Sequence, residues 1–291
     1  MPETVPCLIC GAADSITQTR KTRFANVPAP LEVARCTACG FEQLNPRLTI
    51  EEYARHYVTH PYYQATNATR GATRGRFYNA KMARLERWRP QRGRLLVIGC
   101  VDGGYAAAVA QARGWQVEAV EFSPILAAHA RGLGVRTHLS RGWDPSVVEG
   151  REFDAVYSHS LEHVPFPRQT VQQCRQLLAA DGLLFVEVPN QFGSVVALLK
   201  RAVFRVADST IDRWLIRDDK TEFHTCYFVP KTLDALLERA GFVVLTRRTY
   251  LPWHPIYLRK DGAVQWVQES LHALGGVIGR GPCIEIVARR K

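Results

Sequence analysis

The stretch LLVIGCVDGGYAAAVAQARGWQVEAVEFS, residues 95–123, decides the fold that we expect for this chain. An apolar run over residues 95–98 is followed by a glycine-containing loop and an alanine-rich segment. A second apolar run covers residues 117–120. Short apolar runs separated by a helical segment are typical of a β-loop-α-β unit, so this pattern predicts a parallel α/β sheet.

The ends of these two apolar runs carry the residues expected around a nucleotide. Gly99 ends the first run, and Gly103 and Gly104 follow in the loop. Glycine allows the backbone to approach a ligand because it has no Cβ. Glu121 ends the second run about twenty residues after Gly99, the spacing at which a carboxylate reaches a ribose. The unit therefore predicts a nucleotide-type ligand at the carboxyl ends of the strands.

The composition bounds the class of protein and its partners. The chain has 291 residues, enough for one sizeable core and a small accessory module. With 38 Lys+Arg against 27 Asp+Glu the net charge is +11, which favours anionic partners such as nucleic acid, nucleotide-linked substrates or acidic glycans. No apolar run is long enough to cross a bilayer, and the first residues lack the pattern of a secretory signal. We therefore expect a cytoplasmic protein with no membrane span.

Part of the positive charge is concentrated before the β-loop-α-β unit. Between Arg70 and Arg94 there are nine Lys/Arg residues and one acid, Glu86. A solvated helix face explains most such runs, and a grip on nucleic-acid phosphates is the functional alternative.

Two cysteine pairs near the start of the chain predict a metal site. Cys7 and Cys10 form the first Cys-x-x-Cys pair, Cys36 and Cys39 form the second, and a glycine follows each pair. Two residues between thiolates let one turn aim both sulfurs at one ion, and two pairs complete a closed tetrahedral Cys₄ site, which is structural. Disulfides are the alternative, and a cytosolic chain disfavours them. We predict a small zinc ribbon.

Strands and helices alternate along the rest of the chain. The expected strands cover residues 95–99, 116–121, 135–138, 153–158, 183–189, 242–250 and 282–289. The expected helices cover residues 50–57, 75–88, 104–113, 124–131, 167–179 and 230–240. This alternation predicts an α/β fold with a parallel-type sheet covered by helices on both faces. The last two strands have no good helical pattern between them, so we expect them to form an antiparallel edge pair.

The predicted organisation has three parts. A zinc-binding module covers residues 1–48, a helical connector covers 49–90, and the Rossmann-like domain covers 91–291. An insertion near 191–222 contains an apolar helical stripe, and we interpret it as a cap over a ligand pocket. A helix that only covers the core is the alternative.

Four stretches of residues 75–291 resemble class I S-adenosylmethionine-dependent methyltransferases. They are the glycine loop with Glu121, EFDAVYSHSLEHVPFP at 152–167, LLAADGLLFVEVPN at 177–190, and HTCYFVP at 224–230 together with Ala240-Gly-Phe. Cysteine knuckles in front of such a domain resemble a bacterial subgroup that acts on sugars, polysaccharide precursors and secondary metabolites. The resemblance implies a Rossmann-like seven-stranded sheet, with S-adenosylmethionine as the cofactor.

The resemblance also implies which residues hold the cofactor. The backbone at Gly99, Cys100 and Gly103 would face the methionine portion, and Glu121 would accept both ribose hydroxyls. Phe122 would flank the adenine, and Ser158 and His159 would border the methionine and the transferable methyl.

Two positions depart from the family pattern. The family has an acid where this chain has Val97, and a second loop glycine where it has Val101. The first change removes a polar anchor for the cofactor, and the second places a Cβ where backbone approaches the ligand. A shifted loop that uses Asp102 and Gly104 would compensate in part. A domain that binds the cofactor weakly or not at all is the alternative.

Methyl transfer to an alcohol requires a base that removes the hydroxyl proton. His163 and Glu162 follow the fourth expected strand, and His224 precedes an aromatic turn. These three are the predicted catalytic residues, with loop stabilisation as the alternative role for His163 and Glu162.

Three functions are compatible with these features. The favoured one is O-methylation of a small molecule or glycan, such as a sugar, a nucleotide-linked sugar, or a polysaccharide-precursor or secondary-metabolite acceptor. An RNA methyltransferase is the second, although the Asn/Asp-Pro-Pro-Tyr/Phe signature of many nucleic-acid enzymes is absent. The third is a catalytically degenerate scaffold protein.

Overall fold

The computed structural model describes residues 2–22, 31–59, 75–100, 102–203, 224–252 and 263–291. The chain separates into two compact units. Unit 1 contains Met1–Thr49, Val188–Leu236 and Arg247–Glu285, and unit 2 contains Ile50–Glu187, Leu237–Thr246 and Ile286–Lys291. The domain boundaries predicted from the sequence are not tested by this division and stay a prediction.

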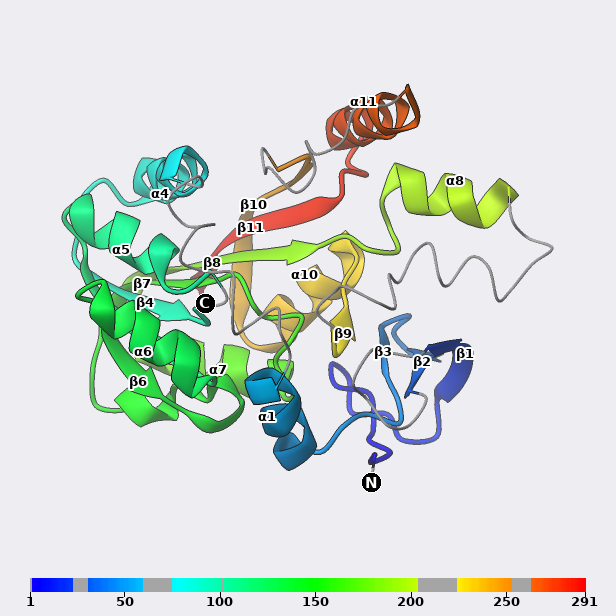
Figure 1. The fold of residues 1–291 in the computed structure, drawn as a ribbon, viewed down its shortest axis with the longest axis horizontal. Coiled ribbons are helices and arrows are strands. Elements are labelled where there is room, and N and C mark those ends of the chain that lie inside the picture. Colours follow the sequence, from blue (N-terminus) through cyan, green and yellow to red (C-terminus); the bar gives the residue numbers. More distant parts are fainter. Residues whose placement is uncertain (1, 23–30, 60–74, 101, 204–223, 253–262) are drawn as a thin grey trace. The chain divides into compact units, whose positions relative to one another are not determined.

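Unit 1 contains a four-stranded antiparallel sheet in the order β1-β2-β3-β9 (Figure 1). The strands are β1 (Ile16–Thr22), β2 (Leu31–Cys36), β3 (Glu42–Leu44) and β9 (Cys226–Tyr227). In β2 the alternating residues Leu31 and Val33 are fully buried, as expected for a strand that packs one face on a core. The ring of Phe41 packs on that of Phe228, with centroids 5.3 Å apart. A segment far along the chain thus completes a sheet that begins near the N-terminus.

The larger sheet has seven strands in the order β10-β11-β8-β7-β4-β5-β6. They are β4 (Arg94–Ile98), β5 (Gln116–Glu121), β6 (Arg136–Leu139), β7 (Phe153–Ser158), β8 (Leu178–Pro189), β10 (Phe242–Tyr250) and β11 (Cys283–Arg290). The pairs β4–β5, β5–β6, β4–β7 and β7–β8 are parallel. Most residues of the central strands are buried, as expected for parallel strands that are covered on both faces.

The helices of unit 2 either precede β4 or connect the parallel strands. They are α1 (Ile50–Thr59), α4 (Gly75–Trp88), α5 (Tyr105–Ala112), α6 (Pro124–Gly132) and α7 (Pro167–Leu177). The chain moves from β4 outward through β5 to β6, and then returns to β7 and continues to β8 on the other side. Because parallel crossovers are right-handed, α5 and α6 lie on one face of the sheet and α7 on the other. The predicted seven-stranded Rossmann-like fold is therefore confirmed.

The C-terminal part of the fold differs from the prediction in one respect. The backbone amide of Lys291 donates to Gly241, and that of Asn190 donates to Pro282, so β11 runs antiparallel to both of its neighbours. The expected antiparallel edge is confirmed. However, a helix that the sequence did not predict, α11 (Ala263–Val277), lies between β10 and β11. Its last turn contains Gly275 and Gly276, which weaken the helical pattern because glycine is a poor helix former.

The remaining helices are α8 (Val195–Val203) and α10 (Pro230–Arg239), with short 3₁₀ turns at Arg141–Trp143 and Pro145–Val148. Helix α8 begins the predicted cap insertion, whose residues 204–223 lie outside the described part, so the cap stays a prediction. Among the described residues, no helix combines the length and apolarity needed to span a membrane.

Candidate active site and metal centre

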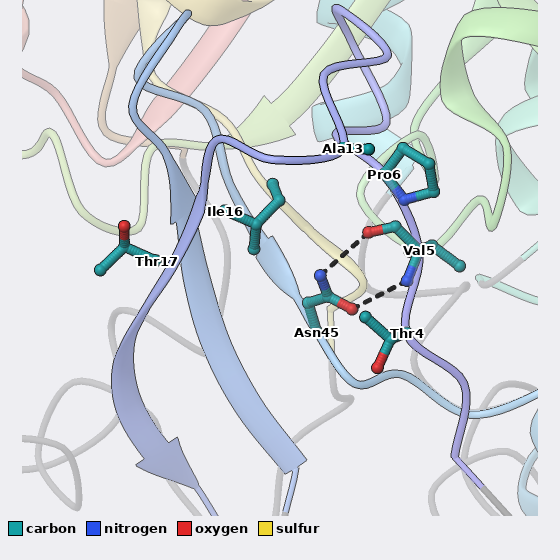
Figure 2. A pocket seen from close by; sticks show the side chains of 7 residues that line it. All are labelled: Thr4, Val5, Pro6, Ala13, Ile16, Thr17 and Asn45. Carbon is teal, nitrogen blue, oxygen red and sulfur yellow. Dashed lines mark hydrogen bonds between the residues drawn. The ribbon is translucent and has the colours of Figure 1, made fainter.

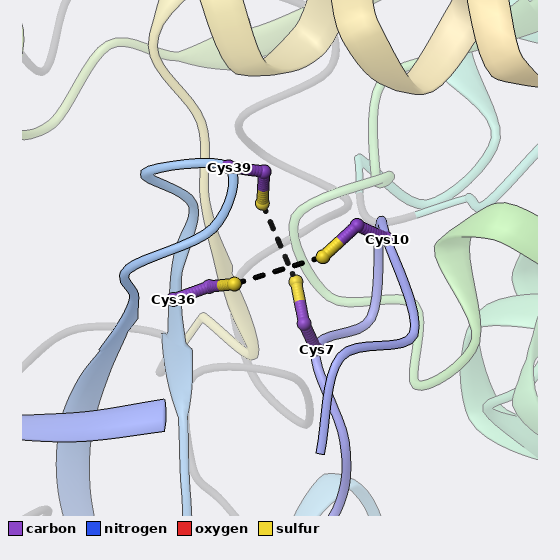
Figure 3. Close-up of side chains that lie close together, drawn as sticks. All are labelled: Cys7, Cys10, Cys36 and Cys39. Carbon is purple, nitrogen blue, oxygen red and sulfur yellow. Dashed lines mark hydrogen bonds between the residues drawn. The ribbon is translucent and has the colours of Figure 1, made fainter. Parts of the chain in front are cut away.

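The four predicted metal ligands come together in unit 1 (Figure 3). Sγ of Cys7 lies 3.5 Å from Sγ of Cys39, and Sγ of Cys10 lies 3.6 Å from Sγ of Cys36. All four sulfurs lie within 4.8 Å of one another. None of the eight cysteines, all of which belong to the described part of the chain, forms a disulfide.

These distances fit a zinc ion. Zinc–sulfur bonds of about 2.3 Å in a tetrahedron place neighbouring sulfurs about 3.8 Å apart. The two turns are closed by Gly11 and Gly40, whose amides donate to the carbonyls of Cys7 and Cys36 at 2.8 Å. Both glycines have a positive φ, 80° and 78°, which a side chain would disfavour. The donor set and its spacing therefore suit a closed, structural Cys₄ site.

Two buried amide side chains hold the first cysteine turn in place, a feature that the sequence did not predict. Gln43 accepts from the amide of Leu8 at 2.8 Å and donates to the carbonyl of Pro6 at 3.1 Å. Asn45 accepts from the amide of Val5 at 3.0 Å and donates to its carbonyl at 2.9 Å. The segment around Cys7 is thus fixed by protein hydrogen bonds as well as by any ion.

A hollow of about 700 Å³ adjoins this segment (Figure 2). Its lining residues are Thr4, Val5, Pro6, Ala13, Ile16, Thr17 and Asn45. They carry no charge, and both polar atoms of the Asn45 amide are already bonded to Val5. The hollow therefore offers no strong anchor for a charged or polar ligand.

The glycine loop of unit 2 requires glycine at two positions. Gly99 has φ +86°, and a Cβ placed on it would lie 2.1 Å from Oγ of Ser160. Gly104 has φ +89°, and a Cβ there would lie 2.5 Å from the Cβ of Ala130 in α6. The first glycine brings the loop close to the residues that follow β7, and the second lets α5 pack against α6.

Asp102 fixes the loop from within. Its carboxylate accepts from the amide of Gly104 at 2.9 Å and from that of Ala106 at 2.7 Å. Asp102 thereby satisfies backbone donors at the start of α5, where a negative charge is also favoured by the helix dipole. The family departure at Val101 lies outside the described residues, whereas Val97 is a buried residue of β4.

Glu121 lies at the end of β5, as predicted, but its carboxylate is directed at backbone amides. It accepts from Phe122 at 2.7 Å, from Ser123 at 2.6 Å and from Cys100. The side chain is fully buried, and this desolvation raises its pKa from 4.5 to about 6. Glu121 thus ties the end of β5 to the glycine loop.

The end of β7 presents two buried hydroxyls to this loop. Oγ of Ser158 and Oγ of Ser160 are both buried, and neither has a hydrogen-bond partner among the described residues. Buried polar groups are normally satisfied, so each of these hydroxyls is a candidate for contact with a ligand.

The space between the loop and the end of β7 is small. Gly99, Asp102, Ala106, Tyr157, His159 and Ser160 enclose about 10 Å³, room for about one water molecule. Small-molecule pockets commonly measure about 300–1,000 Å³. This part of the site is therefore closed, and a cofactor would have to open it.

His159 has two charged neighbours that the sequence did not single out. Its Nε2 lies 3.4 Å from Oε1 of Glu187 in β8, and the same oxygen is bonded to Nζ of Lys81 in α4. The Lys81 and Glu187 side chains are 0% and 2% exposed, whereas that of His159 is 35% exposed. No sequence spacing relates residues 81, 159 and 187, so only the fold could reveal this group.

His163 and Glu162 lie in the turn after β7, where the amide of His163 donates to Ser160 at 3.0 Å. His163 is 1% exposed, and its Nδ1 lies 3.5 Å from the hydroxyl of Tyr53 in α1. Its Nε2 lies 3.8 Å from Oε1 of Glu162.

Trp143 packs on the rings of Tyr53 and Phe122, with centroids 5.9 and 5.0 Å apart. The predicted adenine neighbour Phe122 thus belongs to a buried aromatic cluster.

The third predicted base lies in unit 1. Nδ1 of His224 is 2.8 Å from the amide oxygen of Gln191, and its ring is tilted against that of Tyr227 at 6.3 Å. The hydrogen bond to Gln191 places a proton on Nδ1, which leaves Nε2 as the acceptor nitrogen of a neutral ring.

Three arginines near the start of β4 form ion pairs. The pairs are Arg89 with Asp154 and Asp181, Arg92 with Glu86, and Arg94 with Glu118. Residues 70–74 of the basic segment lie outside the described part. The charges of these three arginines are thus balanced by acids of the same unit, which favours the interpretation as a solvated face over a grip on phosphates.

Comparison with known proteins identifies the larger part of the chain. A family model described as a methyltransferase domain matches residues 70–247. The ubiquinone biosynthesis O-methyltransferase of Xylella fastidiosa (strain 9a5c) is 30% identical over 169 residues, which is 55% of this chain and 65% of that protein. The alignment therefore spans slightly less than two thirds of that relative.

Solved structures share the fold at low identity. The 1,6-didemethyltoxoflavin-N1-methyltransferase of Burkholderia thailandensis, solved with S-adenosylhomocysteine, is 15% identical with a TM-score of 0.54, covering 94% of this chain and 100% of that one. A chain from the Haloferax volcanii complex of the Trm112 methyltransferase activator with a putative methyltransferase is 14% identical with a TM-score of 0.53, covering 77% and 93%. At these identities the likeness concerns the fold alone.

Proposed function

Because the chain belongs to the methyltransferase-domain family, we propose that it transfers a methyl group from S-adenosylmethionine to a hydroxyl group. The oxygen acceptor is supported by the name of the Xylella relative, which is an O-methyltransferase. As the acceptor we propose a sugar, a nucleotide-linked sugar, or a polysaccharide-precursor or secondary-metabolite molecule. The net charge of +11 suits an anionic acceptor of this kind.

One observation carries the cofactor proposal: Gly99 approaches the end of β7, where the hydroxyls of Ser158 and Ser160 are buried without a described partner. The backbone of Gly99, Cys100 and Gly103 would hold the methionine portion, with Ser158 and His159 beside it. Glu121 would hold the ribose and Phe122 the adenine. S-adenosylmethionine supplies an electrophilic methyl group when it is bound.

Binding requires the loop to open. The enclosed space of about 10 Å³ has to grow, and Glu121 has to exchange amide hydrogen bonds for bonds to ribose hydroxyls. The protein then positions the acceptor hydroxyl and the methyl group in line, and it removes the hydroxyl proton. His163, Glu162 and His224 stay the bases predicted from the sequence.

Calorimetric titration with S-adenosylmethionine and S-adenosylhomocysteine tests this proposal. We expect micromolar binding to the wild-type protein and at least tenfold weaker binding to Glu121→Gln. Glu149→Gln, which alters an exposed carboxylate of the same unit, is the matched control and should bind like the wild type. Absence of both heat and thermal stabilisation in the wild type would contradict the proposal.

A scaffold protein without catalysis is the second candidate, and the closed loop favours it. The Glu121 carboxylate already accepts three amide bonds, so the site is satisfied without a ligand. A wild-type protein that binds neither cofactor form would support this candidate. An RNA methyltransferase receives less support, because the described arginines near β4 are paired. RNA binding that weakens steeply with salt would revive it.

We also propose that Cys7, Cys10, Cys36 and Cys39 hold one structural zinc ion. The sulfur spacings of 3.5 and 3.6 Å and the all-thiolate donor set support zinc. Such a site has no open coordination position, so it stabilises the fold and takes no part in methyl transfer. Elemental analysis of the purified protein should give one zinc per chain, and none in a variant that lacks two of the cysteines.

A further inference from the structure

We infer that His159 is the residue that removes the acceptor proton, and that Glu187 and Lys81 position it and set its proton affinity. The inference rests on the proposed methyl transfer, and it assigns the base to a histidine for which the sequence favours a contact with the cofactor. It is based on three observations. His159 lies at the carboxyl end of β7, its two partners are buried, and Glu187 contacts both His159 and Lys81.

His159 is placed at the reacting edge of the sheet. It follows Ser158, the last residue of β7, and it lines the small cavity together with Gly99 and Ser160. Ligands of open α/β sheets bind outside the carboxyl ends of the strands, which is where this imidazole lies. With 35% of its side chain exposed it can meet an acceptor, whereas His163 is 1% exposed and lies against Tyr53.

Glu187 lies behind the imidazole and cannot itself meet an acceptor. Its side chain is 2% exposed, and Oε1 faces both Nε2 of His159 and Nζ of Lys81. A carboxylate at this position keeps a proton on Nε2 and leaves Nδ1 as the acceptor nitrogen. It also stabilises the imidazolium that forms when Nδ1 takes a proton.

Lys81 limits how strongly the carboxylate acts on His159. Its ammonium group is fully buried, bonded to Glu187 and placed 4.0 Å from the centroid of the Phe77 ring. A buried ion pair is often no more stabilising than apolar residues of the same volume. A Lys–Glu pair directly behind an accessible imidazole therefore suggests a role other than stability. By pairing with Glu187, Lys81 weakens the attraction between that carboxylate and a protonated imidazole, which favours the neutral ring that can accept a proton.

The proposed proton and methyl transfer balances in atoms and electrons. The O–H bond of the acceptor breaks and its proton moves to Nδ1 of His159, while the electron pair stays on the oxygen. That oxygen forms the new bond to carbon as the methyl group leaves sulfur, which keeps the electron pair of the broken bond. The imidazolium beside Glu187 then gives its proton to water. No oxidant or further reactant is needed.

Among the described residues, titratable groups from several elements lie near His159. Glu187 belongs to β8, Lys81 to α4 and Tyr157 to β7, with the Tyr157 ring centroid 6.3 Å from that of His159. Asp102 of the glycine loop lines the same cavity. Of these, only the charges of Glu187 and Lys81 are changed in the experiment.

The test is the pKa of His159 measured by NMR titration of the ring nitrogens, without cofactor or substrate. Glu187→Gln leaves the Lys81 charge beside the ring and should lower the pKa of His159 by about 1 unit. Lys81→Met leaves the carboxylate without its ammonium partner and should raise it by a similar amount. Shifts of opposite sign support the inference, and equal pKa values in all three proteins overturn it.

A second pair of variants covers the case in which a buried single charge prevents folding. Lys81→Met combined with Glu187→Leu removes both charges and should fold, because an apolar pair replaces the ion pair. Its His159 pKa should fall between those of the single variants. Glu187→Asp keeps the charge, so its His159 pKa should lie closer to the wild-type value than that of Glu187→Gln does.

Kinetics then separate this inference from the proposed function. His159→Asn should lower kcat at least 100-fold, whereas His138→Asn, which alters a histidine of β6 outside the cavity lining, should retain most of kcat. If His159→Asn keeps the wild-type kcat, the inference is wrong and the methyltransferase proposal stands. If the wild type binds no cofactor, the proposed function fails, and with it the catalytic role of His159.

Discussion

The cysteine cluster of unit 1 and the glycine loop of unit 2 prepare for their ligands in opposite ways. The four sulfurs already stand at the spacing that a zinc ion needs, and Gln43 and Asn45 hold the first turn in that place. The loop instead encloses about 10 Å³, and its acid, Glu121, is occupied by backbone amides. The first region is preformed and the second is closed.

The two regions differ in what interacts with their charged groups when the ligand is absent. Four thiolates around one point repel each other without a cation, so the spacing of this cluster suits a bound metal ion. In the glycine loop, by contrast, the Glu121 carboxylate accepts hydrogen bonds from nearby backbone amides when no nucleotide is bound. We therefore expect metal removal to disrupt unit 1, and cofactor removal to leave unit 2 folded.

Metal removal should have the largest effect. Chelation of the zinc-loaded protein should abolish the slow hydrogen exchange of β2 and β3, because binding free energies of structural zinc sites are about 10–16 kcal/mol. Exchange measured by mass spectrometry should leave β4, β5 and β7 protected. Cys174→Ala, which changes a buried cysteine of α7, is the control and should retain the metal. Retained protection of β2 after chelation would break the contrast between the two regions.

Gly99→Ala should have the next largest effect, on both cofactor affinity and stability. The new Cβ would lie 2.1 Å from Oγ of Ser160, in addition to the strain of φ +86°. Gly134→Ala is the matched control, because Gly134 has φ +81° but nothing within 4 Å of the added atom. Urea denaturation should show a cost of about 1–2 kcal/mol for Gly134→Ala, from backbone strain alone, and more for Gly99→Ala. Equal costs would mean that the close approach to Ser160 is relaxed in solution.

Gln43→Ala should weaken the preformed region by a moderate amount. The substitution leaves the amide of Leu8 and the carbonyl of Pro6 without their partner, at a cost of about 1–3 kcal/mol for each buried group. Zinc transfer to a chromogenic chelator should become faster. Gln111→Ala removes an exposed amide that reaches the carbonyl of Gly134 at 3.4 Å. It should change neither the stability of the protein nor the rate of zinc release. Unchanged zinc release in Gln43→Ala would show that the metal alone orders the first turn.

The smallest effect concerns the pH dependence of Glu121. Its pKa is raised from 4.5 to about 6, so the folded state binds this proton more tightly than the unfolded state. The corresponding stability is present below pH 4.5 and is lost as the pH rises through 6, a difference of about 2 kcal/mol. Glu121→Gln cannot ionise, so its stability should fall less than that of the wild type between pH 4.5 and 7. Parallel stability curves for the two proteins would contradict this.

The sequence predicts the parts of this molecule whose signals are local. The Cys-x-x-Cys spacing predicts which sulfurs converge, and the apolar runs ending at Ile98, Glu121 and Ser158 predict three neighbouring strands of the sheet. In each case one short segment contains both the element and the residue that matters. These predictions needed no knowledge of distant contacts.

Side chains that act through distant partners could not be predicted in this way. Lys81 and Glu187 meet only because the fold brings α4 and β8 together, and neither residue belongs to a recognisable motif. Gln43 is one of many glutamines until β3 aligns it with the first cysteine turn. Helix α11 was missed for a local reason, since glycines in its last turn hide its period.

The pairing of β3 with β9 has a consequence for the order in which the protein is made. Glu42 and Gln43 of β3 pair with Tyr227 and Cys226, which a ribosome adds much later. At a synthesis rate of about 5–20 residues per second, β3 waits on the order of ten seconds or more for its outer neighbour. During that interval the nascent chain exposes an unpaired strand edge beside four thiols. Early capture of zinc would shield the thiols while the rest of the chain emerges.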